Sequence, residues 1–345
     1  MIIYIAKNVE LYNTYLKNLV EAYIEQGVKV IIGYETFIYG NIIPDVIHFH
    51  WVEGLLSNMN YDQDSFFRKL DFYRNCGVKF IYTAHNILPH RDSKKVDYFA
   101  FFSKFLQYID LFVHHGSSSI DIYKEKFSLQ DKDHIICHHG DYLQDMKDFN
   151  ESQEEARKAL LLPRNKKIIL VFGILQFKNL DFVKAVYKKV NKNINDCMLI
   201  LAGINPIFKY GDINRIYIKL NNNLLNKLRR KRRVINKRFS NYETFLLFKS
   251  SDIIFLPHDS GLTTGIIPMS ATIGKPFVYP DIGNFEEEAR YCKCEKYERS
   301  NVEGAYNAIS KLIGDPTSFD NSEWLVNNSW EKHVKLILSK IQNIN

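Results

Sequence analysis

Histidines gather directly after apolar, β-branched segments in the first half of the chain. These segments run into His48-Phe49-His50-Trp51, His85-Asn86, His114-His115 and His138-His139. Together with His90, they hold eight of the 11 histidines. Open parallel sheets bind ligands beyond the carboxyl ends of their strands, where an imidazole can exchange a proton near neutral pH. We therefore expect a polar pocket along one sheet edge, although any one of these histidines can instead be a buried hydrogen-bonding residue.

Metal binding is the other chemistry open to imidazoles. The histidines lie on separate segments, and no carboxylate accompanies them at a ligand spacing. The five cysteines are scattered, apart from Cys292 and Cys294, and form neither a zinc motif nor a disulfide framework. We therefore expect no metal site and no bound cofactor.

Two glycine-containing segments in the second half are candidates for phosphate binding. In one of them, Gly173 follows an expected strand and Lys178 lies near the start of the next helix. The other, residues 256–265, follows a strand and opens a helix. Its candidate ligands are Asp259, Thr263, Thr264 and Gly265. Backbone N–H groups and hydroxyls at a helix N-terminus bind anions, and a lysine adds a cation. Neither segment has P-loop spacing, and the second can also be an ordinary helix cap.

Strand-like and helix-like segments alternate twice along the 345 residues. The expected strands are residues 2–5, 28–32, 45–49, 78–83, 111–114 and 134–137, then 167–172, 197–202, 252–256 and 276–279. This alternation predicts βαβ units with parallel sheets, and the length suits two domains. We predict Rossmann-like domains over residues 1–150 and 151–325, followed by a C-terminal helical segment, 326–345.

Several short motifs, taken together and in order, resemble those of bacterial glycosyltransferases with the glycosyltransferase-B (GT-B) fold, near families 1 and 4. A Trp-Thr-x-His-Asn-x-x-Pro-His signature corresponds to Tyr82-Thr83-Ala84-His85-Asn86-Ile87-Leu88-Pro89-His90. The other motifs are His48-Phe49-His50-Trp51, His139-Gly140-Asp141-Tyr142, Phe172-Gly173 with Lys178, Asp252 and Pro257 with Thr264-Gly265, and Gly274-Lys275-Pro276. They follow the family order over most of the chain.

The resemblance implies two doubly wound α/β domains facing a central cleft, with the helix containing Trp330 crossing back to the first domain. It implies a nucleotide-diphosphate sugar, of UDP or GDP type, as donor substrate on the second domain. The residues around the diphosphate are then Gly173, Lys178, Thr264 and Gly265. The first domain holds a glycan or lipid-linked saccharide acceptor of surface polysaccharide synthesis, and His85 lies near the transferred sugar. Such enzymes need no metal, because a lysine and helix N-termini neutralise the diphosphate.

Two departures from the family pattern bear on the mechanism. Gln176 stands where many relatives have an arginine. Gly261 and Met269 stand where retaining relatives have two glutamates, which leaves retention or inversion open. An inverting reaction needs a base for the acceptor proton. The candidates for that base are His85, Asp92 and Glu53.

The net charge of +7 suggests an anionic partner. The basic stretch 227–238 is expected to lie on an anionic membrane surface or to be a solvated helix face. With neither a signal-peptide pattern nor a membrane-length apolar run, we expect a cytoplasmic protein, peripheral at the inner membrane face. The alternatives are a sugar-nucleotide epimerase of the same fold and a nucleic-acid-binding protein using residues 227–238, for which no recognised nucleic-acid module is found.

Overall fold

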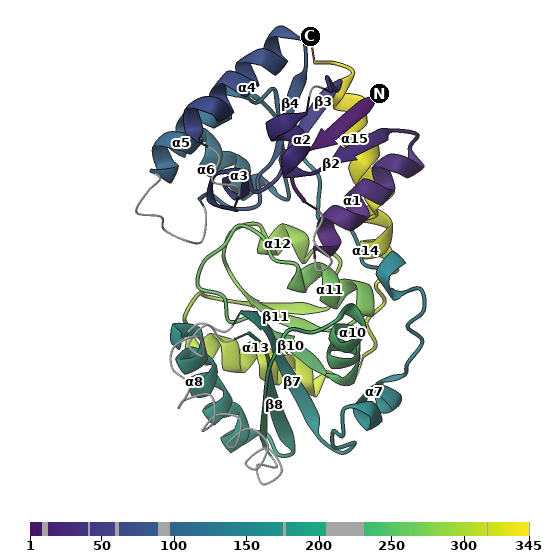
Figure 1. Ribbon diagram of the computed structural model, residues 1–345. Helices are drawn as coiled ribbons and strands as arrows, with labels where there is room; N and C mark the ends of the chain where they lie inside the picture. The colour runs from purple at the N-terminus through teal and green to yellow at the C-terminus, as the bar shows by residue number, and fades with distance from the viewer. Residues whose placement is uncertain are drawn as a thin grey trace, which may run out of the picture. The chain divides into compact units, whose positions relative to one another are not determined.

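The structure is a computed structural model that describes residues 1–8, 13–40, 42–58, 62–88, 97–174, 177–204, 231–315 and 317–344. The chain forms two compact units. The first unit is Met1–Gly140 with Asn327–Asn345, and the second unit is Asp141–Val326. Each unit contains one six-stranded parallel sheet with helices packed on it (Figure 1). The predicted α/β class with two Rossmann-like halves is confirmed.

The first sheet has the strand order β2-β1-β3-β4-β5-β6. Its strands are β1 (Ile2–Ile5), β2 (Lys29–Ile32), β3 (Val46–Phe49), β4 (Lys79–Thr83), β5 (Leu111–His114) and β6 (Asp133–Ile136). All six were predicted, because parallel strands that are covered on both faces are continuous apolar, β-branched runs. β3 and β5 are buried along their whole length.

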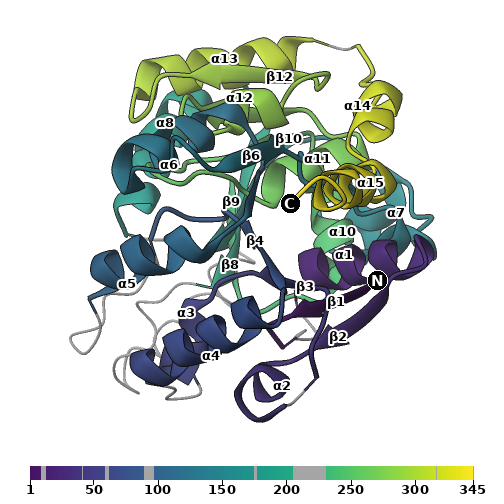
Figure 2. The same cartoon turned by 90° about the horizontal axis from the view of Figure 1, so that it is seen from above.

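The first unit contains helices from the beginning of the chain and one helix from its C-terminus. They are α1 (Thr14–Glu25), α2 (Tyr34–Tyr39), α3 (Glu53–Asn58), α4 (Gln63–Asn75), α5 (Tyr98–Phe105), α6 (Ser117–Phe127) and α15 (Trp330–Ile341). α15 lies beside α1 (Figure 2). Leu16 and Leu19 of α1 share a buried core cluster with Val334 and Ile337 of α15. The expectation that the C-terminal helix packs on the first half is confirmed.

The second sheet has the order β12-β11-β10-β7-β8-β9. Its strands are β7 (Lys167–Ile174), β8 (Cys197–Ile204), β9 (Arg232–Asn236), β10 (Ile253–Phe255), β11 (Phe277–Pro280) and β12 (Cys294–Tyr297). Its helices are α7 (Gln153–Ala159), α8 (Phe177–Asn193), α10 (Asn241–Ser250), α11 (Ile266–Ile273), α12 (Phe285–Glu288), α13 (Val302–Gly314) and α14 (Ser322–Asn327). The two edge strands, β9 and β12, were not predicted.

β9 corrects the interpretation of the basic stretch 227–238. Residues 227–230 lie outside the described residues, but Arg232–Asn236 pairs with β8 as an edge strand. A helical face therefore does not extend over these residues, because ladder pairing takes precedence over the amphipathic pattern. Within the ranges that the structure describes, no helix is both long and apolar enough to cross a membrane.

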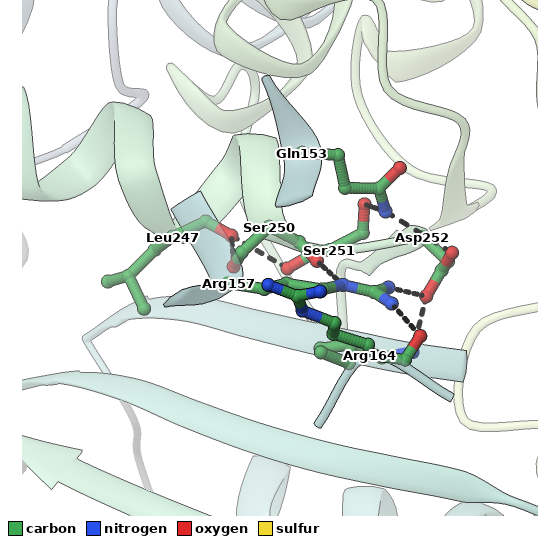
Figure 3. Close-up of polar contacts among 8 residues, drawn as sticks. Gln153, Arg157, Arg164, Leu247, Ser250, Ser251 and Asp252 are labelled. Atoms are coloured by element: carbon green, nitrogen blue, oxygen red, sulfur yellow. Dashed lines mark hydrogen bonds and ion pairs between the residues drawn. The ribbon is translucent and has the colours of Figure 1, made fainter. Parts of the chain in front are cut away.

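α7 is anchored to the second sheet by a buried arginine (Figure 3). Arg157 Nη2 donates to Asp252 Oδ2 over 2.6 Å, and its Nε donates to the Ser250 carbonyl over 2.9 Å. A further guanidinium N–H donates to the carbonyl of Arg164. Asp252 Oδ2 also accepts the backbone N–H of Ile168, at the start of β7. One carboxylate therefore links α7, β7 and the segment that leads into β10.

Candidate active site

Six buried histidines form a cluster at the carboxyl end of the first sheet. The histidine cluster consists of His48, His50, His85, His115, His139 and His333. The first five lie at or just beyond the ends of β3, β4, β5 and β6, and His333 comes from α15. Each is at most 6% exposed. Five of the seven strand-end histidines therefore meet, whereas His114 and His138 lie outside the cluster. The five form a packed layer rather than the expected polar pocket.

Hydrogen bonds hold the imidazoles of the cluster in fixed orientations. His50 Nδ1 and His85 Nε2 are 3.1 Å apart, and His48 Nε2 is 2.8 Å from the Thr83 hydroxyl. The Nδ1 atoms of His115, His139 and His333 lie 2.7–2.9 Å from backbone carbonyls. A carbonyl only accepts, so Nδ1 carries the proton in these three rings. His333 contacts the carbonyl of His138 and so ties α15 to the end of β6.

Aromatic rings fill the space between these histidines. The ring of Tyr15 lies in edge-on contact with five of the six, with centroid distances from 4.8 to 6.3 Å. Trp51 stacks on His85 at 3.9 Å with an interplanar angle of 10°. Trp330 of α15 packs so closely on Gly140 that a Cβ there would lie 2.3 Å from the indole. The cluster is therefore also the packing surface between the sheet and the C-terminal helix.

Burial lowers the pKa of all six imidazoles and keeps them neutral. The pKa falls to about 3 for His48 and to about 4 for His139 and His333. For His85, burial and then the nearby His139, His48 and His333 hold the pKa well below 6.5. A base with so low a pKa accepts protons weakly at neutral pH. His85 is thus better suited to hydrogen bonding than to general-base chemistry.

Asp92 and Glu53 are the other two candidate bases, and the structure describes only Glu53. Asp92 lies outside the described residues. Glu53 stands in the first turn of α3, and burial raises the pKa of its carboxyl. A carboxylate whose pKa is raised toward neutrality is a more effective proton acceptor. Among the described candidates, Glu53 therefore has the more favourable electrostatics for a base.

The candidate phosphate ligands gather at the carboxyl end of the second sheet. Gly173, near the end of β7, has a φ of +113°, and a Cβ there would lie 3.7 Å from Ile266 Cδ1 in the first turn of α11. Beside it, a Cβ on Gly203 would lie 1.7 Å from the Gly173 carbonyl oxygen, so this approach requires glycine. The structure therefore brings Gly173, near the end of β7, next to the start of α11.

The loop from β10 to α11 presents polar groups at that helix start. The Thr264 hydroxyl accepts the Ile266 N–H over 3.3 Å, and Gly265 is the N-cap without a capping side chain. Asp259 lies earlier in the loop, where its carbonyl accepts from Arg299 over 3.5 Å. Lys178 is the second residue of α8, and its side chain lies outside the described ones. Backbone N–H groups at such a helix start can bind an anion.

The structure adds Glu288, which the sequence analysis missed. Its carboxyl accepts a hydrogen bond from the Thr263 hydroxyl, directly before α11. The side chain is 3% exposed, and burial raises its pKa to about 8. The run Glu286-Glu287-Glu288 gave no sign of this, because three consecutive glutamates are typical of a solvated helix start.

Comparison with known proteins places the fold. No protein-family model and no curated protein sequence matches the chain. A sucrose-phosphate synthase from Thermosynechococcus elongatus superposes with a TM-score of 0.71 at 13% identity, covering 99% of this chain and 98% of that one. The α,α-trehalose-phosphate synthase (UDP-forming) from Burkholderia xenovorans, solved with glucose-6-phosphate, gives 0.64 at 9%, covering 99% and 100%. HepE from Anabaena, solved with UDP-glucose, gives 0.65 at 12%, covering 99% of each chain.

The chain has the GT-B fold. The fold expectation is thereby confirmed over nearly the full length of these structures. At 9–13% identity the similarity establishes the fold alone. The subgroup signature around His85 and the individual site residues stay predictions.

Proposed function

We propose that this protein is a glycosyltransferase that moves a sugar from a nucleotide-diphosphate sugar to an acceptor hydroxyl. The observation that carries this proposal is the meeting of Gly173, near the end of β7, with the start of α11, at the sheet edge where open α/β sheets bind ligands. The proposed donor is of UDP type. It is supported by the ligands with which similar proteins were solved, among them HepE with UDP-glucose.

In the proposed reaction, the bond between the sugar's anomeric carbon and the diphosphate breaks, and a bond to the acceptor oxygen forms. The diphosphate leaves with the bonding electrons. N–H groups at the start of α11, the Thr264 hydroxyl and Lys178 stabilise its charge, because donors that are already oriented lose little free energy in reorganisation. The acceptor proton passes to a base of the first unit, for which Glu53, His85 and Asp92 are the candidates.

The finer proposal concerns the acceptor. We infer a glycan or lipid-linked saccharide of surface polysaccharide synthesis, presented at an anionic membrane surface. The net charge of +7 and the basic stretch 227–238 support it, because each cation near such a surface contributes up to about 1 kcal/mol of binding. Liposomes containing anionic lipid test this part separately from transfer activity.

Replacing Lys178 should weaken nucleotide binding. Lys178→Ala is expected to reduce UDP affinity by about 1.5–3 kcal/mol, the scale of a lost charged hydrogen bond. Titration calorimetry measures it. Lys184→Ala is the matched control, because Lys184 lies on the same helix and pairs with Asp181 on the surface. Unchanged affinity in Lys178→Ala would remove this lysine from the site.

Replacing His85 tests whether the first unit contacts the transferred sugar or the acceptor. If His85 contacts the transferred sugar or acceptor, His85→Ala should lower turnover by about 10²-fold or more, with little change in UDP affinity. His114→Ala is the control, because His114 is equally buried and bonds Ser119 and His134 away from the histidine cluster. Turnover per folded molecule and thermal stability are measured together. If His85→Ala loses only stability, by about 1–3 kcal/mol, the residue is structural.

A further inference from the structure

Glu288 is a buried carboxyl beside the helix start that we propose for donor binding. Its neighbour Glu286 forms an ion pair with Lys296 at the surface. Glu288 is 3% exposed, and within the part of the chain that the structure describes no cation pairs with it. A buried, unpaired carboxyl is costly when ionised, so it stays protonated instead. Burial accordingly raises its pKa to about 8.

This carboxyl holds the segment that leads into α11. The Thr263 hydroxyl donates to Glu288 Oε1, and the neighbouring backbone N–H of Thr264 acts on the carboxyl electrostatically. The backbone of Glu288 is held in place as well, because Trp324 Nε1 donates to its carbonyl over 3.0 Å. Glu288 thus connects α12 by a hydrogen bond to Thr263, which directly precedes Thr264 and α11.

The same loop is packed against the turn between β11 and α12. The Asn284 N–H donates to the Leu262 carbonyl over 2.8 Å. A Cβ on Gly283 would lie 2.4 Å from the Gly261 carbonyl oxygen, so the two loops are in backbone contact. Backbone contacts therefore fix Gly261 and Leu262, and the Glu288 side chain fixes the next residue, Thr263, through its hydroxyl.

The second carboxyl oxygen of Glu288 indicates more than a structural link. Glu288 Oε2 is fully buried and has no hydrogen-bond partner among the described residues. An unpaired buried polar atom costs about 1–3 kcal/mol, and such atoms are retained where function requires them. This cost is not needed for the hydrogen bond to Thr263, which uses Oε1 alone.

We propose that Glu288 is a positioning residue of the donor site, which fixes Thr263 and Thr264 so that the Thr264 hydroxyl and the first N–H groups of α11 face the diphosphate of the nucleotide sugar. This inference rests on the proposed function. The carboxyl does so in its neutral form, because a carboxylate at this position would repel the anionic diphosphate. Among the described titratable groups, Glu287 and Tyr142 interact electrostatically with Glu288. Burial keeps the pKa of Tyr142 far above neutrality, so Tyr142 stays uncharged.

A dependence on pH follows from the neutral form. As the pH rises through about 8, Glu288 ionises and places a negative charge next to the anion site. If only the protonated form supports binding, UDP affinity falls about tenfold for each pH unit above that value. Glu288→Gln keeps the neutral shape and cannot ionise. It should bind UDP as the wild type does at pH 7 and keep this affinity at pH 9.

The experiment measures UDP affinity by calorimetry from pH 7 to 9.5 for the full-length wild type, Glu288→Gln and Glu288→Ala. Glu286→Gln is the matched control and should follow the wild type, because Glu286 pairs with Lys296 at the surface. Titration of UDP itself is common to all variants and cancels in the comparison. Glu288→Ala should bind at least about tenfold more weakly at pH 7, since the threonines lose their support. Thr263→Val removes the same hydrogen bond from the other side and should weaken binding in the same direction.

The outcomes separate this inference from the proposed function. If the wild type binds UDP, but Glu288→Gln loses affinity with pH as the wild type does, the positioning role is wrong. It is equally wrong if Glu288→Ala, shown to be folded by thermal melting, binds like the wild type. A wild type that binds no nucleoside diphosphate would instead overturn the proposed function.

Discussion

Lowering the pH from 7.5 to 5.5 is expected to unfold the first unit while the second stays folded. The cause is the histidine cluster, whose six imidazoles are buried and neutral. The pKa of His48 is about 3 in the folded chain, and those of His139 and His333 are about 4. In the unfolded chain all of them titrate near 6.5. The free energy of unfolding of the first unit is therefore highest above pH 6.5, and it decreases as the pH falls below that value.

The expected loss is comparable to the stability of a whole domain. Below pH 6.5 the unfolded state takes up protons that the folded state cannot accommodate. Each histidine then lowers the free energy of unfolding by about 1.4 kcal/mol per pH unit. Together the six histidines lower the free energy of unfolding by about 8 kcal/mol at pH 5.5. The whole free energy of unfolding of a domain is about 5–15 kcal/mol. His114, with a pKa of about 3, adds to the effect.

Tryptophan fluorescence can follow each unit separately. Trp51 and Trp330 lie in the first unit in contact with the histidine cluster, and Trp324 lies in the second. Trp324→Phe therefore makes the signal specific to the first unit. The second unit is the internal control, because His258 is the only histidine of residues 141–326. His139→Asn should reduce the loss by about 1.4 kcal/mol per pH unit, since an amide can replace Nδ1–H without ionising. Urea midpoints that are equal at pH 7.5 and 5.5 would contradict the prediction.

The sequence predicts central strands well and edge strands poorly. β3 and β5 are covered on both faces, so they are continuous apolar runs that stand out from their surroundings. β9 and β12 are the two edges of the second sheet. Their sequences, Arg232-Arg233-Val234-Ile235-Asn236 and Cys294-Glu295-Lys296-Tyr297, carry the charges that half-exposed edges tolerate. Polarity that suits an edge strand is also typical of a solvated helix or loop.

The sequence predicts where the strand-end histidines lie, but it does not predict that they are buried. Strand ends meet at one edge of a parallel sheet, so the positions of His48, His85 and His115 predict that they lie close together. Whether they face solvent depends on what covers them. Here Trp330 and His333 cover them, from more than 200 residues further along the chain than His115. Glu288 was missed for the same reason, since its burial depends on contacts with Thr263 and Trp324 that no local pattern encodes.

Removing the Arg157 guanidinium is expected to destabilise the second unit by about 3–5 kcal/mol. The side chain of Arg157 is 9% exposed and that of Asp252 is 22% exposed, so Arg157→Ala leaves a largely buried carboxylate without its partner. The carbonyls of Ser250 and Arg164 lose their donor as well. Lys275 also acts on Asp252 electrostatically, so part of the charge remains compensated. The effect should appear in urea unfolding followed by Trp324 fluorescence, because this tryptophan lies in the second unit.

Two variants show whether the buried geometry causes this effect. Arg164→Ala removes an arginine that pairs with Glu154 on the surface, where both side chains are about two-thirds exposed. It should cost less than about 1 kcal/mol, because solvent screens exposed pairs. Arg157→Lys keeps the charge but cannot donate in three directions from one planar group, so it should fall between the two. Arg157→Asp with Asp252→Arg does not restore the bonds to Ser250 and Arg164, and should stay destabilised. If Arg157→Ala were no more damaging than Arg164→Ala, the link through Asp252 between α7, β7 and β10 would not be what stabilises this unit.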